Sequence, residues 1–412
     1  MTLTVREAQS EILSNVLPLG RVECVALSDS LGRVLARDCP SDVNVPSCDN
    51  SAMDGYAVRA SDLAGAQPSS PARLRLVETI RAGDRATRAL EVGETYRIFT
   101  GALLPPGADA VVMQEDVLVE GAAILFRSPV RLQANVRLAG EDLRFDDTAV
   151  PAGSLLRPQE IGVLASAGHD SVPVVARPRV AVLSTGSELV GVRDLPEPGQ
   201  VRNSNAFTLE ALVRETGCQP ILFPPVPDDV PATREALSRA CGTADADLVL
   251  TSGGVSVGDY DLVLNCLQAL GWRKLFWKVR MKPGHPVAAG LLHGKLVLGL
   301  PGNPVSVAVA FLQFARPALR KMLGLQRLLP ATISASLLEP YNGKGDREHF
   351  VPCTLEARPD GSWAAGLSLP HGSGILRSLS LAQGLLVVPL GTKHIPAGST
   401  VSVQPFTESL YC

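Results

Sequence analysis

The 412-residue sequence lacks an excess of positive charge, although its overall composition is that of an ordinary globular protein. Its 38 Lys and Arg residues against 41 Asp and Glu give a formal net charge of −3. No global basic field therefore exists to hold a nucleic acid backbone, and we expect no nucleic acid partner. A local pocket for a small anion remains compatible with this balance. With 46% hydrophobic and 19% charged residues, the composition also argues against extended disorder.

Cysteines at metal-binding spacing are also missing. None of the eight cysteines forms a C-x-x-C pair, so the sequence offers no zinc-binding or redox motif of that kind. Cys218, Cys241 and Cys266 fall in or beside apolar helical patterns, where a reduced thiol serves as a small buried hydrophobe. We therefore expect mostly reduced, structural thiols.

The chain has no uninterrupted apolar run that would form a signal peptide or a spanning helix. Residues Met1–Ser10 lack an apolar core, and the apolar stretch Leu296–Phe314 is broken by Pro301, Asn303 and Pro304. We accordingly expect a cytoplasmic protein without a membrane partner.

A chain of this length divides into domains, because single hydrophobic cores stop growing near ~250 to 300 residues. Four blocks differ in pattern: a discontinuous mixed domain (1–43 with 140–177), a β-rich inserted domain (44–139), an α/β domain (178–327) and a C-terminal β-barrel domain (328–412). In the insert, short alternating runs such as Leu74–Val77 and Thr95–Ile98 are separated by turn residues. Beyond Pro330 helical patterns stop, and short strands with Gly and Pro turns favour a small barrel or sandwich.

The α/β block alternates strand, glycine loop and helix. Strands are predicted at Val180–Leu183, Pro220–Phe223, Leu248–Leu250, Leu275–Val279 and Leu296–Leu298. Helices are predicted at Ala206–Glu215, Ala232–Ala240, Asp261–Leu270 and Val305–Leu323. This alternation predicts a three-layer domain, with a parallel sheet covered on both faces and ligands at the carboxyl ends of its strands.

The strongest local motif is the loop that follows Leu248–Leu250. It contains Ser252, Gly253, Gly254, Ser256 and Asp259, directly before a predicted helix. Paired glycines let backbone N–H groups approach a phosphate, and the helix start adds its positive end. A tight turn alone would need one glycine, so we interpret this segment as a ligand-binding loop.

Acidic residues follow two other strands of the same domain. Glu188 lies in the loop after the first strand, where it would either ligate Mg²⁺ or cap a helix start. Asp228 and Asp229 follow the second strand. Paired acids in a loop are usually only solvated, but this loop should share the sheet edge with Glu188 and Asp259, where a divalent ion would need oxygen ligands.

Cationic and capping residues mark the last part of the α/β block. Lys278 and Lys282 lie four residues apart before the turn at Pro283, so on one extended strand they would share a face and meet one anionic group. A plain exposed edge strand would also carry lysines. Asn303 and Pro304 predict a helix N-cap and first turn, where Ser306 would contact an oxyanion.

The inserted block carries two motifs rich in small polar groups, around Asp54 and Thr100. Turn chemistry alone accounts for the Asp54-Gly55 pair. Nothing in the residues themselves assigns these motifs a function.

Taken together, the motifs resemble the MoeA family of molybdopterin molybdenumtransferases, which includes the gephyrin E domain. The matching stretches occur in family order over nearly the full length: NSAMDGYA, IFTGALLPPGADAVVMQED, GEDLR, STGSEL, TSGGVSVGDYD, KVRMKPGHP and LPGNPVS. The resemblance implies an elongated four-domain homodimer, with the pterin site in the α/β domain and the partner's insert closing it. It also implies insertion of molybdate into adenylated molybdopterin with release of AMP, dependent on Mg²⁺ or Zn²⁺.

Roles carried over from the family cover two groups of positions. As catalytic residues the resemblance implies Asp54, Thr100, Glu188, Asp228 and Asp259, with the last three as metal ligands. As binding residues for substrate it implies Ser252, Gly253, Gly254, Ser256, Lys278, Lys282, Pro283, Ser306, Arg347 and Ser378. It further implies transient contacts with the adenylating MogA-type enzyme and with proteins that mature molybdoenzymes.

Two positions depart from the family pattern. His285 stands where many bacterial members have lysine, and Pro352 replaces a basic residue often found after Arg347. Two other functions compete with molybdate insertion: a peptide-binding scaffold, as for the gephyrin E domain, and the adenylation step of the related MogA-type fold. The chain lacks gephyrin's second catalytic domain and linker, and the MogA-type fold corresponds to about residues 178–325 alone.

Overall fold

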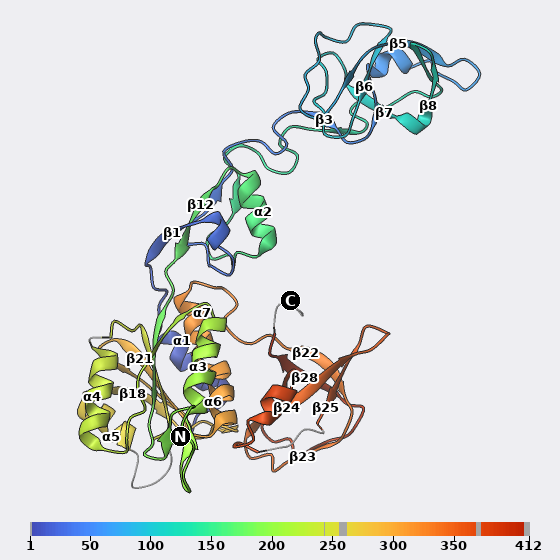
Figure 1. Ribbon diagram of the computed structural model, residues 1–412. Coiled ribbons are helices and arrows are strands. Elements are labelled where there is room, and N and C mark those ends of the chain that lie inside the picture. The colour runs from blue at the N-terminus through green and yellow to red at the C-terminus, as the bar shows by residue number, and fades with distance from the viewer. Residues whose placement is uncertain (1, 243, 255–261, 368–371, 408–412) are drawn as a thin grey trace. The chain divides into compact units, whose positions relative to one another are not determined.

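The structure is a computed structural model that describes residues 2–242, 244–254, 262–367 and 372–407 (Figure 1). The chain falls into two units. Unit 1 consists of residues 1–23, 32–36 and 174–412, and unit 2 consists of residues 24–31 and 37–173. The chain leaves unit 1 within strand β1 (Val22–Ala26), re-enters it for residues 32–36, and returns to it finally within β12 (Ser171–Val175).

A mixed six-stranded sheet is the centre of the α/β part of unit 1. Its order is β16-β13-β17-β21-β20-β18. The strands are β13 (Arg179–Ser184), β16 (Gln219–Leu222), β17 (Leu248–Ser252), β18 (Arg273–Trp277), β20 (Ala288–Leu292) and β21 (Lys295–Leu300). Strands β13, β16, β17 and β21 are parallel, as predicted, whereas β20 pairs antiparallel with both β21 and β18. The all-parallel prediction is therefore wrong at this side of the sheet, because β20 was not recognised as a strand.

Helices cover both faces of this sheet, which confirms the three-layer prediction (Figure 1). Alternate strand residues supply the two cores: Val180 and Val182 pack on one face, and Ala181 and Leu183 pack on the other. The first face is covered by α3 (Ser204–Glu215) and α6 (Pro304–Ala310), and the second by α4 (Val230–Cys241) and α5 (Leu262–Ala269). This alternation follows from the two-residue period of a strand.

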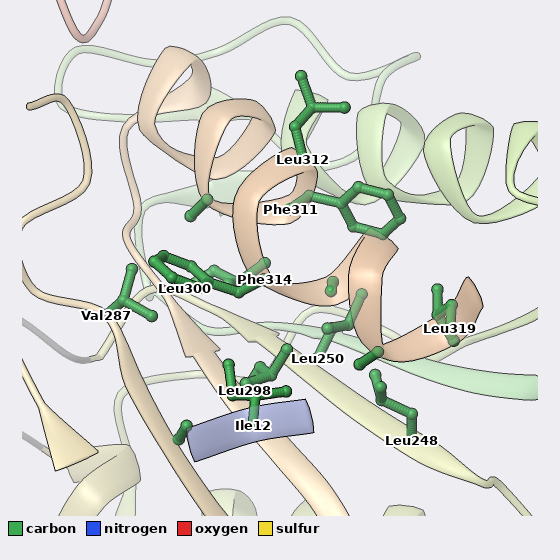
Figure 2. Close-up of a cluster of buried hydrophobic side chains, with 14 of the residues drawn as sticks. Ile12, Leu248, Leu250, Val287, Leu298, Leu300, Phe311, Leu312, Phe314 and Leu319 are labelled. Atoms are coloured by element: carbon green, nitrogen blue, oxygen red, sulfur yellow. The ribbon is translucent and has the colours of Figure 1, made fainter. Parts of the chain in front are cut away.

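The last helix of the α/β part is continuous in sequence but not uniform in geometry. Segment α6 passes into a π-helical segment, η4 (Phe311–Ala315), and then into α7 (Arg316–Met322). Phe311 and Phe314 are fully buried, and Figure 2 shows Phe314 close to Leu300 in this core. The N-terminal helix α1 (Val5–Ser14) contributes Ile12 to the same cluster. Residues 1–23 thus group with the α/β part.

The C-terminal part of unit 1 is a closed five-stranded barrel, as predicted. Its strands are β22 (Ile333–Leu337), β24 (Glu348–Ala357), β25 (Trp363–Gly366), β26 (Gly384–Val388) and β28 (Thr400–Pro405). Pairing of β24 with β26 closes the ring. Strand β19 (Met281–Lys282) from the α/β part adds to β24 in parallel, so the chain before the Pro283 turn is attached to the barrel. The short strands β23 (Tyr341–Asn342) and β27 (His394–Ile395) form a separate pair, and α8 (Arg377–Leu381) precedes β26.

Unit 2 is organised around a second six-stranded sheet, in the order β7-β4-β6-β5-β9-β8. The strands are β4 (Gly55–Val58), β5 (Ala72–Ile80), β6 (Glu94–Ile98), β7 (Ala110–Met113), β8 (Val117–Glu120) and β9 (Ala123–Phe126). This confirms the β-rich character predicted for the insert, including strands at Leu74–Val77 and Thr95–Ile98. The unit also contains short pairs of β2 (Cys39–Pro40) with β11 (Thr148–Val150) and of β3 (Asn50–Ser51) with β10 (Val136–Arg137), and helix α2 (Pro158–Ser166).

Candidate active site

Three strands of the α/β sheet end side by side, and their loops meet at one edge. In the register, Ser184 of β13 lies beside Ser252 of β17, which lies beside Leu300 of β21. The N–H of Thr185 donates to the carbonyl oxygen of Ser252 at 3.0 Å, and the N–H of Gly253 donates to that of Leu300 at 3.1 Å. The loops predicted to share this edge therefore do so.

Both glycines of the predicted ligand loop are required by the backbone. Gly253 and Gly254 have φ values of +97° and +65°, a region that L side chains rarely adopt. A Cβ atom at Gly253 would lie 2.6 Å from the carbonyl oxygen of Thr185, and one at Gly254 would lie 2.4 Å from Cγ2 of Val263. The loop thus brings bare main chain to the sheet edge, as phosphate-binding loops require. Ser256 and Asp259 lie outside the described residues.

Asn205, which was not predicted as a site residue, joins the loops. Its Nδ2 donates to Oγ of Ser252 at 2.8 Å and to the carbonyl oxygen of Gly302 at 2.7 Å. It stands at the start of α3, where the side chain of Asn203 already caps the helix through the N–H of Ala206. The sequence does contain a signal for this role. A helix start needs one capping asparagine, so a second asparagine two residues later indicates a different function.

Several buried polar atoms at this edge have no partner among the described residues: Oγ of Ser184, Oγ1 of Thr251 and Oδ1 of Asn205. Buried hydroxyl and amide oxygens are normally hydrogen-bonded. Unsatisfied polar atoms beside a glycine loop are the chemistry expected of a site for a polar ligand.

Glu188 and Asp228 come together in two neighbouring loops. Oδ2 of Asp228 accepts from the N–H of Ser187 at 3.0 Å, and the N–H of Asp228 donates to Oγ of Ser187 at 2.9 Å. The Glu188 carboxylate lies over Gly186, where a Cβ atom would be 2.4 Å from Oε2. Both acids are exposed. The alternative that Glu188 caps a helix is wrong, because the short strand β14 (Leu189–Val190) follows it and pairs with β15 (Val201–Arg202).

The two other acids of the prediction differ in role. Asp229 is the N-cap of α4, since its side chain accepts from the N–H of Ala232 at 2.9 Å. Within the described residues no group of three His, Cys, Asp or Glu side chains is arranged to hold a metal. Asp259, the third proposed ligand, is not among those residues.

A cavity of about 740 Å³ lies between the turn at Pro283, the start of α6 and the first strands of the barrel. Its lining includes Lys282, Pro283, Ser306 and Arg347 from the predicted set. Lys282 lies beside His349 in the β19–β24 register. Glu339 is the acidic side chain in the lining, and its Oε2 accepts from the N–H of Leu367 at 2.8 Å. Arg347 also lies 3.6 Å from the Asp346 carboxylate, which is not itself part of the lining. The lining therefore carries two permanent cations and one engaged carboxylate, an arrangement that favours a small anion.

The helix start at this cavity differs in detail from the prediction. Asn303 occupies the N-cap position and Pro304 the first turn, as predicted, but the Asn303 side chain makes no capping bond. Its Nδ2 instead donates to Oγ of Ser373 at 3.1 Å. Ser306 is 3% exposed and lines the cavity at the first turn of α6.

Two predicted binding residues do not line this cavity. Strand β18 ends at Trp277, and Lys278 has a φ of +69°, so Lys278 and Lys282 do not lie on one extended strand and the shared-face prediction is wrong. The Lys278 ammonium lies 4.0 Å from the centroid of the Trp277 ring, a cation–π contact. Ser378 is buried in α8, where its hydroxyl donates to the carbonyl oxygen of Ile375 at 2.7 Å.

Three other lining residues have ordered polar contacts. Nδ1 of His285 lies 2.7 Å from the carbonyl oxygen of Val279. The Tyr341 hydroxyl lies 2.7 Å from Nδ1 of His349, and burial raises the pKa of this phenol, so it stays protonated at neutral pH. Neither Tyr341 nor His349 was predicted, because they lie eight residues apart on different strands and meet only through the fold of the barrel region.

In unit 2 the structure brings Asp54 and Thr100 together. Oδ1 of Asp54 accepts from both the N–H and the hydroxyl of Thr100 at 2.8 Å. The pKa of the Asp54 carboxyl is lowered from its usual range, mainly by the bond from the Thr100 backbone N–H and next by the bond from its hydroxyl. The two motifs thus form one carboxylate site held in its charged form.

Comparison with protein families divides the sequence into three matched regions. The MoeA N-terminal region (domain I and II) matches residues 3–168, a probable molybdopterin binding domain matches residues 181–321, and the MoeA C-terminal region (domain IV) matches residues 334–406. The three regions follow one another over nearly the whole chain.

Curated relatives and solved structures agree with these regions. The sequence is 39% identical over 388 residues to a molybdopterin molybdenumtransferase of a Nostoc species, covering 92% of this chain and 88% of that protein. It is 31% identical over 404 residues to one of Staphylococcus epidermidis, covering 97% and 95%. The fold is similar to a crystal structure of the molybdopterin biosynthesis moeA protein of Pyrococcus horikoshii, with a TM-score of 0.86, 31% identity and coverage of 98% and 100%. In the described residues no helix is long and apolar enough to cross a bilayer.

Proposed function

This chain belongs to the MoeA family, and from that premise we propose that it is a molybdopterin molybdenumtransferase that inserts molybdate into adenylated molybdopterin and releases AMP. The observation that carries this proposal is the pairing of two sites in unit 1. A glycine loop and unsatisfied polar atoms lie at the sheet edge, and a cationic cavity lies between that edge and the barrel. The loop from β21 to α6 contributes to both.

We assign the pterin and its phosphates to the sheet edge. The main chain at Gly253 and Gly254 has the conformation and the close approach that a phosphate-binding loop needs. Asn205 holds Ser252 and the Gly302 carbonyl beside it. We also keep Ser256 and Lys278 as ligand contacts in this proposal, on the strength of the family motifs alone.

We assign molybdate to the cavity. Lys282 and Arg347 supply positive charge, and Ser306 supplies a hydroxyl donor at a helix start. A tetrahedral dianion held here would be positioned close to the loop that carries the pterin, which shortens the search for the reacting geometry. Ser378 belongs to this assignment only through the family motif, since its hydroxyl is engaged with Ile375.

We propose Mg²⁺ as the metal, with Zn²⁺ as the alternative, held by Glu188, Asp228 and Asp259. Glu188 and Asp228 fit this role, because exposed carboxylates in adjoining loops are hard oxygen donors of the kind that Mg²⁺ prefers. When bound, the ion neutralises charge on the diphosphate that is cleaved. Ser187 orients Asp228 through both of its bonds, so this loop keeps the carboxylate in place.

We further propose that the enzyme is a homodimer of four-domain copies, with residues 1–23 packed against the α/β domain, and that Asp54 and Thr100 of one copy act at the site of the other. Two observations support this. Thr100 holds the Asp54 carboxylate in its charged form. Among the described residues of unit 2 we find no phosphate-binding loop with which this carboxylate could form a complete site. All seven described cysteines are free, in keeping with a cytoplasmic enzyme. Transient contact with a MogA-type enzyme would supply the adenylated substrate.

The experiment that tests the reaction is AMP release from adenylated molybdopterin by purified protein, with and without Mg²⁺ and molybdate. We expect molybdate-stimulated release that is lost in Asp259→Ala and Asp54→Ala. Tight pterin binding without release in the unmodified protein would instead support a carrier or scaffold. Adenylation activity in the same protein would support the MogA-type step.

The dimer proposal has its own test. Asp54→Ala is expected to be inactive, and Lys282→Ala is expected to lose most AMP release at a molybdate concentration that just saturates the parent. We expect mixing and reassembly of the two variants to restore part of the activity, because some sites then combine two intact halves. No recovery, with mixed dimers demonstrated by differently tagged copies, would place both residues in the same chain's site.

A further inference from the structure

The His285 ring is held in one protonation pattern when it is neutral. A carbonyl oxygen only accepts hydrogen bonds, so the 2.7 Å contact with Val279 requires the proton on Nδ1. A neutral ring then has a lone pair on Nε2 and acts there as an acceptor. Since an acceptor repels an anion, the ring in this form does not suit an oxyanion site.

The backbone around His285 fixes the ring at the cavity. The N–H of Val279 donates to the carbonyl oxygen of His285 at 3.0 Å, so the two residues exchange a pair of bonds. Gly284 takes a φ of +99°, and its missing Cβ would lie 3.3 Å from Cε of Met281. His285 is half-buried and lines the same cavity as Lys282. Any rotation of the ring would therefore break the bond to Val279.

The charged and titratable groups that face this cavity come from every element around it. The lining groups are Lys282 of β19, Tyr341 of β23, Arg347 and His349 at the start of β24, and Glu339. The Asp346 carboxylate lies behind this lining, 3.6 Å from Nε of Arg347. Glu339 is engaged with the Leu367 N–H, and Tyr341 is a neutral phenol. With Asp346 included, the permanent charges at and directly beside the lining are two positive and two negative. A tetrahedral dianion bound here would be better balanced by one further positive charge.

We propose that oxyanion binding in this cavity is coupled to proton uptake at Nε2 of His285, which converts the ring from an acceptor into a cationic donor. The proposal rests on the assignment of molybdate to this cavity made above. Protonation leaves the Nδ1 bond to Val279 unchanged, so no rearrangement is needed. By linkage, a site that takes up a proton on binding loses affinity as pH rises.

The experiment is calorimetry of the full chain with molybdate alone, at one pH near neutrality, in two non-phosphate buffers that differ in ionisation enthalpy. We expect the apparent binding enthalpy to differ between the buffers by a fraction of the difference between their ionisation enthalpies. That fraction is the number of protons taken up per molybdate bound, which should lie between zero and one. Equal enthalpies in the two buffers would overturn the proposal.

Two variants of His285 assign the proton. In His285→Asn the amide nitrogen replaces Nδ1 against Val279 while nothing replaces Nε2, so we expect the buffer dependence to vanish and the affinity to fall about fivefold. In His285→Lys the charge is permanent, so we expect buffer dependence to vanish with affinity kept within about threefold. Uptake that persists in His285→Asn and disappears in His349→Gln would assign the proton to His349 and overturn the proposal.

Lys282→Ala separates this inference from the proposed function. If molybdate binds and Lys282→Ala weakens it, the cavity is the oxyanion site, and a missing buffer effect then refutes only the role of His285. If molybdate does not bind, or binds equally well to Lys282→Ala, the cavity assignment fails and the proposal on His285 fails with it.

Discussion

The sheet edge and the cavity of unit 1 offer a ligand different parts of the chain. At the edge, contacts come from main chain exposed by Gly253 and Gly254, whose Cβ atoms the fold could not accommodate. In the cavity, contacts come from the side chains of Lys282, Ser306 and Arg347, which belong to segments far apart in the sequence. The β21–α6 loop borders both, so we propose that the two regions serve neighbouring parts of one substrate complex.

This contrast predicts how each region tolerates substitution. A main-chain site depends on φ angles and bare backbone, so any side chain added there should disturb the fold and the ligand together. A side-chain site is built on a scaffold that stands without it, so truncation should remove binding and leave stability nearly unchanged.

Gly253→Ala should destabilise unit 1 by about 3 kcal/mol, combining about 1 to 2 kcal/mol for the left-handed backbone with the cost of the 2.6 Å approach to Thr185. Gly271→Ala is the matched control, because its φ is +87° but a Cβ there meets nothing within 4 Å. It should lose only about 1 kcal/mol. Urea unfolding of the two variants measures the difference. Equal losses would mean that the close approach to Thr185 is relieved at little cost.

Lys282→Ala should weaken molybdate binding by about tenfold or more, since charge-assisted hydrogen bonds are worth about 1.5 to 3 kcal/mol. Its unfolding free energy should stay within about 0.5 kcal/mol of the parent, because the side chain is exposed. Lys274→Ala on β18 is the control, also exposed but absent from the cavity lining. It should change neither quantity. Calorimetric titration and urea unfolding test both variants, and loss of stability without loss of binding would contradict the side-chain assignment.

Sequence patterns were sufficient where local chemistry decides the structure. The runs Val180–Leu183 and Leu248–Leu250 are rich in branched aliphatic residues and became β13 and β17, and the glycine loop follows directly from β17. Strand β20 was missed because Ala288, Ala289 and Gly290 look like loop or helix residues. Gly290 has no side chain because Trp272 packs there, and a Cβ at Gly290 would lie 2.3 Å from that ring. A pattern of neighbouring residues cannot predict this contact, because Trp272 lies 18 residues earlier in the sequence.

Contacts between distant segments account for the other differences. Lys278 was placed on the wrong face because its backbone leaves the extended region after Trp277, a turn that no glycine or proline marks. Tyr341 and His349 meet only through the fold of the barrel region. Asn205 was missed because its neighbour Asn203 already explained an asparagine at a helix start. For Asn205 the deciding partners, Ser252 and Gly302, lie far away in the sequence, whereas for Lys278 the deciding feature is a local φ angle that its residue type does not signal.

Asn205→Ala tests whether the edge is held by side chains as well as by glycines. Loss of its two bonds, to Ser252 and to the Gly302 carbonyl, should cost about 2 kcal/mol of stability and weaken pterin binding. Asn203→Ala removes one capping bond to Ala206 and should cost about 1 kcal/mol without changing pterin binding. Unfolding and pterin titration of both variants separate the two roles. Unaltered pterin binding in Asn205→Ala would show that the main chain alone shapes the edge.

The smallest expected effect concerns the carboxylate site of unit 2, where main chain and side chain act on the same atom. The Thr100 N–H and hydroxyl both lower the pKa of Asp54, so the carboxylate stays charged to lower pH than an ordinary aspartate. Thr100→Val removes only the hydroxyl bond, and the pKa of Asp54 should rise part of the way back. If catalysis needs charged Asp54, AMP release falls as pH drops through that pKa, so the acid limb of the pH profile should move to higher pH.

The matched control for that shift is Thr87→Val, which removes the hydroxyl bond from Thr87 to Glu78 elsewhere in unit 2. It should leave the acid limb in place, because the carboxylate it affects has no proposed part in the reaction. An unmoved limb in Thr100→Val would mean either that the backbone N–H alone sets the pKa of Asp54 or that another group limits the rate. Asp54→Asn decides between these, since the limb must disappear with the carboxylate if Asp54 sets it.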